Sequence, residues 1–179
     1  MDNRTLLNYC RQVVGQLEIP APYDVAEVCD LIEQRRGRQL SVLPMAIPVY
    51  EGSPSGLWVE TDDCDYILYQ ANTTRAHQEH IVAHEIGHML LDHRSLPSDQ
   101  DEVSQLLMPS LDPALVRTVL SRTSYLDLEE QQAEVVASLL PIQAGQSQRR
   151  QAARDVPAGV ANLVDHLERS LLARSGRRI

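Results

Sequence analysis

The chain of 179 residues contains no lysine and no phenylalanine. All 16 of its basic residues are arginines, which indicates a GC-rich coding bias and says little about mechanism. There are 25 acidic residues, and the resulting net charge of −9 argues against non-specific binding of the whole chain to nucleic acid. The basic segment 174–179 is interpreted as a solvated terminus, with contact to an acidic partner as the alternative.

Cysteine is scarce as well. Cys10, Cys29 and Cys64 are odd in number and widely spaced, which excludes a disulfide framework and a Cys-x-x-Cys zinc site. The first residues are followed by no apolar run typical of a signal peptide, and no stretch of about 18 apolar residues could cross a membrane. We therefore expect a cytoplasmic protein with reduced thiols and no membrane partner.

One motif stands out in what the sequence does contain. Residues 84–88 read His-Glu-Ile-Gly-His, and on a helix His84 and His88 lie one turn apart on the same face. Two imidazoles placed in this way can bind one zinc ion. Glu85 can then reach a water on that zinc and take its proton as the water attacks a carbonyl. The motif predicts a zinc-dependent peptidase with Glu85 as the general base.

The alternative is a solvated helix that carries two surface histidines. Against it stands an apolar stripe at helical spacing, which predicts that the helix has a buried flank. Gly87 supports the same interpretation, because glycine inside a helix costs about 1 kcal/mol and is tolerated where another element approaches closely. The stripe consists of Ile81, Val82, Ile86, Met89 and Leu90.

Periodicity, caps and breakers predict an α+β fold with a mainly helical body and a small antiparallel or mixed β-sheet next to the zinc helix. Trp58 is interpreted as a core residue, with stacking on a substrate as the alternative. We expect a domain over 1–145, followed over 146–179 by a linker and a helix packed on it. The predicted helices are 5–17, 25–36 with Asp24 as N-cap and Gly37 after its end, 74–91, 112–121, 128–140 before Pro141, and 157–174. The predicted strands are 39–45, at an edge or irregular, and the hairpin 57–61 with 65–70, while 92–105 is a candidate rim over a cleft and 145–150 a linker.

A catalytic zinc usually has three protein ligands and one open position. Glu130 and Glu134 share one face of a later helix, beside the small residues Ala133 and Ala137, so this helix can pack closely against the first. One carboxylate can bind the zinc, and the other can accept a hydrogen bond from a ligand histidine. Glu129 is interpreted as part of an acidic helix start that the macrodipole favours.

These two motifs resemble those of the ImmA/IrrE-like metallopeptidases. That family carries His-Glu-[Ile/Leu]-Gly-His after a strand, and later Glu-x-x-Ala-[Asn/Asp]-x-x-Ala ending near a proline. The resemblance covers about residues 24–141, and Ser55-Gly56-Leu57 before the hairpin also fits it. It implies a zincin-like fold with Zn²⁺ on His84, His88 and Glu130, Glu85 as general base, and Glu134 at the Asn/Asp position. It further implies that the substrate is a DNA-binding transcriptional repressor, so that DNA binding belongs to the partner and not to this chain.

Other candidates surround the motif. His80 lies two turns before His88, which is about 12 Å along a straight helix, so it is expected at the rim or beside a ligand and not on the zinc. His77 and His93 are weaker candidates, and Tyr125 is a candidate for stabilising an oxyanion. Two other functions remain open: a non-enzymatic regulator with a structural zinc, and the toxin half of a toxin–antitoxin pair. A fourth protein ligand, such as His80 or His93, would favour the regulator.

Overall fold

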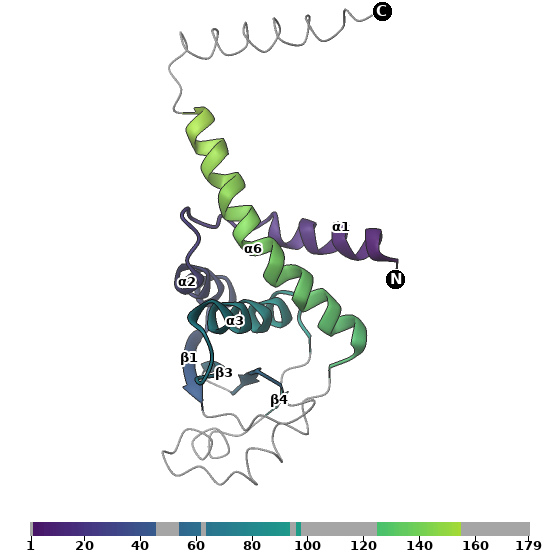
Figure 1. Ribbon diagram of the computed structural model, residues 1–179, viewed down its shortest axis with the longest axis vertical. Coiled ribbons are helices and arrows are strands. Elements are labelled where there is room, and N and C mark those ends of the chain that lie inside the picture. The colour runs from purple at the N-terminus through teal and green to yellow at the C-terminus, as the bar shows by residue number, and fades with distance from the viewer. Residues whose placement is uncertain (1, 46–53, 62–63, 94–95, 98–124, 155–179) are drawn as a thin grey trace, which may run out of the picture.

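The computed structural model describes residues 2–45, 54–61, 64–93, 96–97 and 125–154. These residues form four helices and a four-stranded mixed sheet, which confirms the α+β class (Figure 1). The predicted helices 112–121 and 157–174, the tail 174–179 and most of the predicted rim 92–105 lie outside the described residues. In chain order the elements are α1 (Asn3–Val14), α2 (Val25–Arg36), β1 (Gln39–Met45), β2 (Gly56–Glu60), β3 (Cys64–Gln70), α3 (Arg75–Leu90), β4 (Leu96–Pro97) and α6 (Asp127–Arg154).

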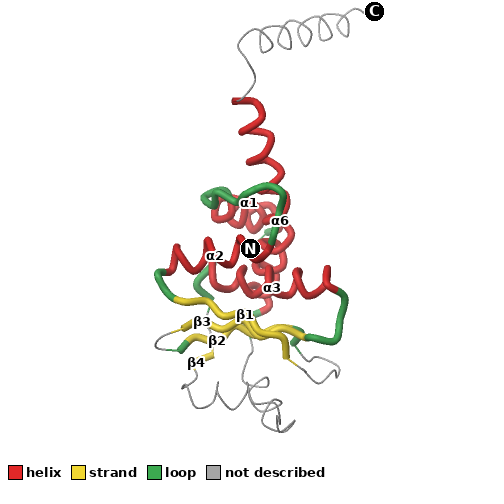
Figure 2. The backbone as a smooth tube through the Cα atoms, turned by 90° about the vertical axis from the view of Figure 1, so that its left-hand side faces the viewer, coloured by secondary structure: helices red, strands yellow, loops and turns green. Residues whose placement is uncertain are grey.

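The strand order is β1-β3-β2-β4. β2 and β3 form the predicted antiparallel hairpin, whereas β1 pairs with β3 in parallel, and β4 pairs in parallel with β2 only at Val59 and Glu60. β1 is an edge strand, as predicted, and the edge accommodates Pro44 because its missing N–H leaves no ladder partner unsatisfied there. Figure 2 shows the helices stacked over one face of the sheet, so that the side chains between the two layers form the core.

Side-chain caps set the start of each of the first three helices. Asp2 accepts hydrogen bonds from the backbone N–H groups of Arg4 and Thr5, Asp24 accepts one from Ala26, and Thr74 accepts one from His77. Each cap satisfies an N–H that has no partner within its own helix. Gly37 ends α2 with a φ of 65°, a left-handed conformation that glycine adopts without steric cost. The predicted cap at Asp24 and the predicted stop at Gly37 are thereby confirmed.

Trp58 lies in the core and not at a surface where it could stack on a substrate. It is 1% exposed, and its indole N–H donates to the Asp65 carboxylate at 3.3 Å. The buried Asp65 also accepts from Arg36 Nε at 2.8 Å, and the guanidinium carbon of Arg36 lies 5.0 Å from the centre of the indole ring. A buried carboxylate requires such partners, so this group anchors α2 to the sheet.

α6 is longer than predicted and corrects two expectations. The helix was expected to stop before Pro141 and to be followed by a linker at 145–150, yet it runs unbroken from Asp127 to Arg154. Pro141 removes one backbone hydrogen bond, but packing on both sides of it offsets the loss. Leu140 and Ala144 are fully buried, and the Gln143 amide donates to the Leu17 carbonyl at 3.4 Å. No helix in the described part of the chain has the length and apolar character needed to cross a bilayer.

α3 and α6 approach each other closely at Gly87. A Cβ atom on Gly87 would lie 2.9 Å from the Cα and 2.9 Å from the carbonyl oxygen of Ala133, so only glycine fits. Ala133 and Ala137 are buried on the facing side of α6. The predicted close contact between the two motif-bearing helices is confirmed, and it brings both motifs to one place.

Candidate metal centre

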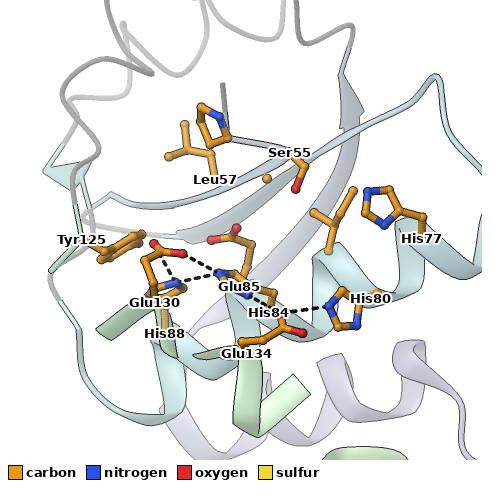
Figure 3. Close-up of a pocket in the computed structure, with 13 residues that line it drawn as sticks. Ser55, Leu57, His77, His80, His84, Glu85, His88, Tyr125, Glu130 and Glu134 are labelled. Carbon is orange, nitrogen blue, oxygen red and sulfur yellow. Dashed lines mark hydrogen bonds and ion pairs between the residues drawn. The ribbon is translucent and has the colours of Figure 1, made fainter. Parts of the chain in front are cut away.

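His84, His88 and Glu130 converge where α3 crosses α6 (Figure 3). The Nε2 atoms of His84 and His88 are 3.1 Å apart. Glu130 Oε2 lies 3.4 Å from His84 Nε2, and Glu130 Oε1 lies 3.7 Å from His88 Nε2. Among the described residues this is the group of histidine, cysteine and acidic side chains whose ligand atoms all lie within 4.8 Å of one another. These three side chains could hold a metal ion.

The spacing of the three residues fits a small divalent ion. Four ligand atoms at 2.0–2.2 Å from a tetrahedral centre stand about 3.3–3.6 Å apart. The distance of 3.1 Å between the two Nε2 atoms, and the distances of 3.4 and 3.7 Å from them to the two oxygens of Glu130, are close to that value, and one ligand atom from each residue lies within 4.8 Å of the other two. Two imidazole nitrogens and one carboxylate oxygen are also ligands that zinc accepts readily. The histidines come from successive turns of α3, and the carboxylate comes from the first turn of α6.

Glu85 sits beside this centre and is almost completely enclosed. It is 4% exposed, and its Oε2 atom has no hydrogen-bond partner among the described residues. Gly56 of β2 lies against it, since a Cβ there would come within 2.6 Å of Glu85 Oε1. Burial raises the pKa of Glu85 to about 7, against the opposing charge of His84. A carboxyl group with such a pKa is suited to exchange protons near neutral pH.

The two histidines differ in their electrostatics. Burial lowers the pKa of His88 to about 3, with a further contribution from the neighbouring His84, so its imidazole is neutral at physiological pH. Burial also acts to lower the pKa of His84, but hydrogen bonding to Glu130 and the charge of Glu85 outweigh it and raise that pKa overall. A neutral imidazole is the form that binds a metal, so His88 is ready to act as a ligand.

Comparisons of the chain with known protein families, with curated proteins and with solved structures found no match. The chemistry of the site is therefore inferred from its own residues.

Glu134 lies one turn beyond Glu130 and contacts the far side of His84. Its Oε2 atom is 3.5 Å from His84 Nδ1 and 3.1 Å from His80 Nε2. The structure thus brings Glu130, and not Glu134, to the Nε2 atoms of both ligand histidines. Glu134 has the contact predicted for a residue that orients a histidine, and its effect on metal binding stays a prediction. His80 pairs with Glu134 and lies outside the metal-binding group, as the helical rise requires.

Glu129 faces away from the centre. Its carboxylate accepts a hydrogen bond from the backbone N–H of Leu126 at 2.9 Å, which satisfies a donor at the start of α6. This contact agrees with the interpretation of Glu129 as part of an acidic helix start.

Tyr125 lies over the ring of His88. The two ring centres are 3.6 Å apart, and the planes are inclined by 19°. Its hydroxyl oxygen is buried without a hydrogen-bond partner among the described residues, and burial raises the pKa of this phenol far above its usual range. Tyr125 therefore remains a protonated donor close to the centre, and its predicted role at an oxyanion is not tested by these contacts.

Two residues at the centre had little or no weight in the interpretation of the sequence. His93, considered only as a weak candidate, is buried, and its Nδ1 lies 2.8 Å from His88 Nδ1. Its Nε2 lies 3.0 Å from Oε1 of Gln132, a residue that was not considered. The spacing of His93 and Gln132 carries no recognised motif, and only the fold brings them together.

The centre opens into a cavity of about 350 Å³. Its walls combine α3, the start of α6 and the segment Pro54–Leu57 that leads into β2 (Figure 3). His77, at the start of α3, contributes to the rim. The two histidines, Glu85 and Tyr125 all line this one cavity, so a molecule that enters it meets the ligand set, the buried carboxyl group and the phenol together.

Proposed function

We propose that the protein is a zinc-dependent endopeptidase with a zincin-like fold, similar to the ImmA/IrrE-like metallopeptidases. The observation that supports it best is the convergence of His84, His88 and Glu130 in the cavity that also contains the buried carboxyl group of Glu85. A zinc ion on these ligands would lower the pKa of a bound water to about 7 and polarise a carbonyl group.

Each residue of the chain then has a separate task. Glu85, held against Gly56 and shielded from solvent, accepts a proton from the attacking water and later returns it to the leaving amine. The protonated phenol of Tyr125 donates a hydrogen bond to the oxygen on which negative charge develops. Glu134 accepts from His84 Nδ1–H and so keeps Nε2 of that ring available as a ligand.

The position of β2 beside the cavity suggests how a peptide substrate would bind. Ser55, Gly56 and Leu57 line it, and within the described residues β4 pairs with β2 only further along, at Val59 and Glu60. We propose that an extended peptide pairs by backbone hydrogen bonds with the edge of β2 next to the centre. Such pairing would bring a scissile carbonyl alongside Glu85.

The contacts of His80 and His93 argue for an enzyme over a regulator with a structural zinc. A fully coordinated structural site needs a fourth protein ligand. His80 is engaged by Glu134, and both ring nitrogens of His93 are engaged by His88 and Gln132. Neither supplies a ligand atom, and among the described residues no other side chain joins the group of three, which supports an enzyme with a position open to water and substrate. As the target we propose a DNA-binding repressor, whose cleavage would release the genes that it controls.

The experiment compares newly formed protein N-termini in cells that carry the wild-type chain or Glu85→Gln. Glu85→Gln preserves the shape of the side chain and removes the base, so the purified variant should retain about one zinc per chain. N-termini that depend on the wild-type chain should fall by about 10²-fold or more. His84→Ala and His88→Ala should lose both zinc and cleavage, whereas His77→Ala, on the same helix, should retain zinc.

Identical sets of N-termini for wild type and Glu85→Gln would refute the peptidase. If Glu85→Gln also preserved every regulatory effect of the wild type, the protein would instead be a non-enzymatic regulator that acts by binding its partner. Full retention of zinc in both His84→Ala and His88→Ala would refute the metal centre itself.

A further inference from the structure

Three side chains, joined by hydrogen bonds, extend from the metal centre into the protein, starting at His88. His88 Nδ1 lies 2.8 Å from His93 Nδ1, and His93 Nε2 lies 3.0 Å from Gln132 Oε1. His88 and His93 are buried, and Gln132 is half-buried on α6. These hydrogen bonds therefore connect the end of α3 to α6, on the side of His88 opposite the ligand atoms.

The direction of these hydrogen bonds follows from the chemistry of imidazole. A neutral imidazole has one N–H donor and one acceptor nitrogen. Gln132 Oε1 can only accept, so His93 Nε2 carries a proton, and in a neutral ring His93 Nδ1 is then an acceptor. His88 Nδ1 must then donate, which leaves the lone pair of His88 Nε2 directed at His84 and Glu130.

The opposite direction would disable the site. If Gln132 presented its amide N–H₂ to His93, both hydrogen bonds would run in the opposite direction. His88 Nε2 would then carry the proton. A protonated Nε2 has no lone pair for a metal ion. The identity of one amide atom on α6 thus decides whether a histidine on α3 can act as a ligand.

The backbone and a neighbouring ring hold His88 and His93 in place. Asp92 adopts a φ of 57°, a left-handed conformation that Asp accepts more readily than most residues, and it turns the chain back at the end of α3. This turn returns the His93 N–H to the His88 carbonyl at 3.1 Å and places the two rings 5.0 Å apart. Tyr125 covers the ring of His88 with a centre-to-centre distance of 3.6 Å.

We propose that Gln132 and His93 form a relay that fixes His88 in the tautomer able to bind the metal, with Gln132 acting through His93. Both are positioning residues and touch neither metal nor substrate. The relay complements Glu134, which contacts Nδ1 of the other ligand histidine, so each imidazole has its own orienting partner. The inference rests on the proposed metal centre but not on peptide cleavage.

The first test reads the tautomer directly. Long-range ¹H–¹⁵N correlation spectra of the full, metal-free chain at neutral pH distinguish a protonated from a bare ring nitrogen. We expect His88 to be protonated on Nδ1 and bare on Nε2, and His93 to be bare on Nδ1 and protonated on Nε2. Protonation of His88 on Nε2 in the wild-type chain would overturn the relay, whatever the enzyme does.

The second test measures zinc affinity by competition with a chelator. Gln132→Met keeps the length of the side chain and removes the acceptor, and loss of a residue that orients a metal ligand typically costs about 10–100-fold in affinity. Gln131→Met, at the exposed neighbouring position, is the matched control and should leave the affinity unchanged. Equal affinities for the two variants would contradict the relay.

The third test separates a relay from simple packing. The side-chain oxygen of Asn can take the place of the Nδ1 acceptor of a histidine, so His93→Asn should accept from His88 Nδ1–H without help from Gln132. Adding Gln132→Met to His93→Asn should therefore cost less than threefold in zinc affinity. The same 10–100-fold loss in that background would show that Gln132 acts independently of His93 and would overturn the relay. Zinc binding with the expected tautomer, but without any protein cleavage, would leave the relay standing and refute only the peptidase.

Discussion

The contact between Gly87 and Ala133 allows a sharp test of how the centre is assembled. In an isolated or exposed helix, Gly87→Ala would stabilise the protein by about 1 kcal/mol, because alanine has the higher helix propensity. In this fold the new Cβ would lie 2.9 Å from two backbone atoms of Ala133, whereas ordinary contacts begin near 3.4 Å. The facing atoms belong to the backbone, so no side-chain rotation can relieve the clash.

Relief requires α6 to move away from α3 by about 0.5 Å, and overpacking of this kind typically costs about 1–3 kcal/mol. Gly145→Ala is the matched control, because Gly145 also lies inside a helix but has nothing within 4 Å of the Cβ position. The gain in propensity is common to both variants and cancels in the comparison. The free energy of unfolding of Gly87→Ala, measured by urea denaturation, should therefore lie about 1–3 kcal/mol below that of Gly145→Ala.

Zinc affinity provides a second measurement of the same displacement. Glu130 lies one turn before Ala133 on α6, so a shift of the helix carries its carboxylate away from the two histidines. Functional groups must be held within about 0.5 Å of their productive positions, and the required shift reaches that limit, so Gly87→Ala should weaken zinc binding by about tenfold or more. Gly145→Ala should bind zinc as the wild type does. If Gly87→Ala were stabilised as much as Gly145→Ala and retained its zinc affinity, the close crossing of α3 and α6 would be wrong.

Three further predictions concern single side chains. Zinc affinity should fall most in Glu130→Ala, less in Glu134→Ala and hardly at all in Glu129→Ala; a larger loss in Glu134→Ala than in Glu130→Ala would exchange their roles. The pKa of Glu85 rises from an ordinary 4.5 to about 7 on folding, so the folded state binds its proton more tightly than the unfolded state does. The resulting contribution to the free energy of unfolding is complete below pH 4.5 and is lost as pH rises through 7. Urea denaturation with a chelator present, at about pH 5 and about pH 8, should therefore show wild type losing about 3 kcal/mol relative to Glu85→Gln, and a pH-independent difference would contradict the burial of its charge. Asp92→Gly should preserve stability and Asp92→Val should lower the melting temperature, since a β-branched residue is strained at a φ of 57°; equal melting temperatures would count against the left-handed turn.

Local signals in the sequence were sufficient for most of the fold near the site. The cap at Asp24 and the stop at Gly37 act within one turn of their own helix, so residue type alone predicts them. The spacing of the histidines and of the two acidic residues is likewise a property of a single helix. The two regular motifs and the small residues between the helices predicted that either Glu130 or Glu134 would meet the two histidines, and only the family resemblance selected Glu130.

Contacts that depend on the tertiary structure could not be predicted in this way. Pro141 is a local signal for the end of a helix, but the buried Leu140 and the hydrogen bond from Gln143 to Leu17 override it. The contact between His93 and Gln132 joins positions 39 residues apart and depends on the left-handed turn at Asp92. Such a turn leaves no periodic pattern in the sequence, because it depends on the conformation of one residue after the helix has ended.

The distance in sequence between the ligands has a consequence for the whole chain. Cys10, Cys29 and Cys64 are free, so within the described residues no covalent bond links one element to another. A metal ion held by His88 and Glu130 would join α3 to α6 and close a loop of roughly 40 residues, and cross-links that close loops of this size restrict the unfolded chain by about 4 kcal/mol. Such an ion would act as a reversible cross-link. Protonation of its ligands or a chelator would remove it, whereas a disulfide is broken only by a reductant. The availability of metal would then govern how long the protein persists in its folded form, in addition to whether it has activity.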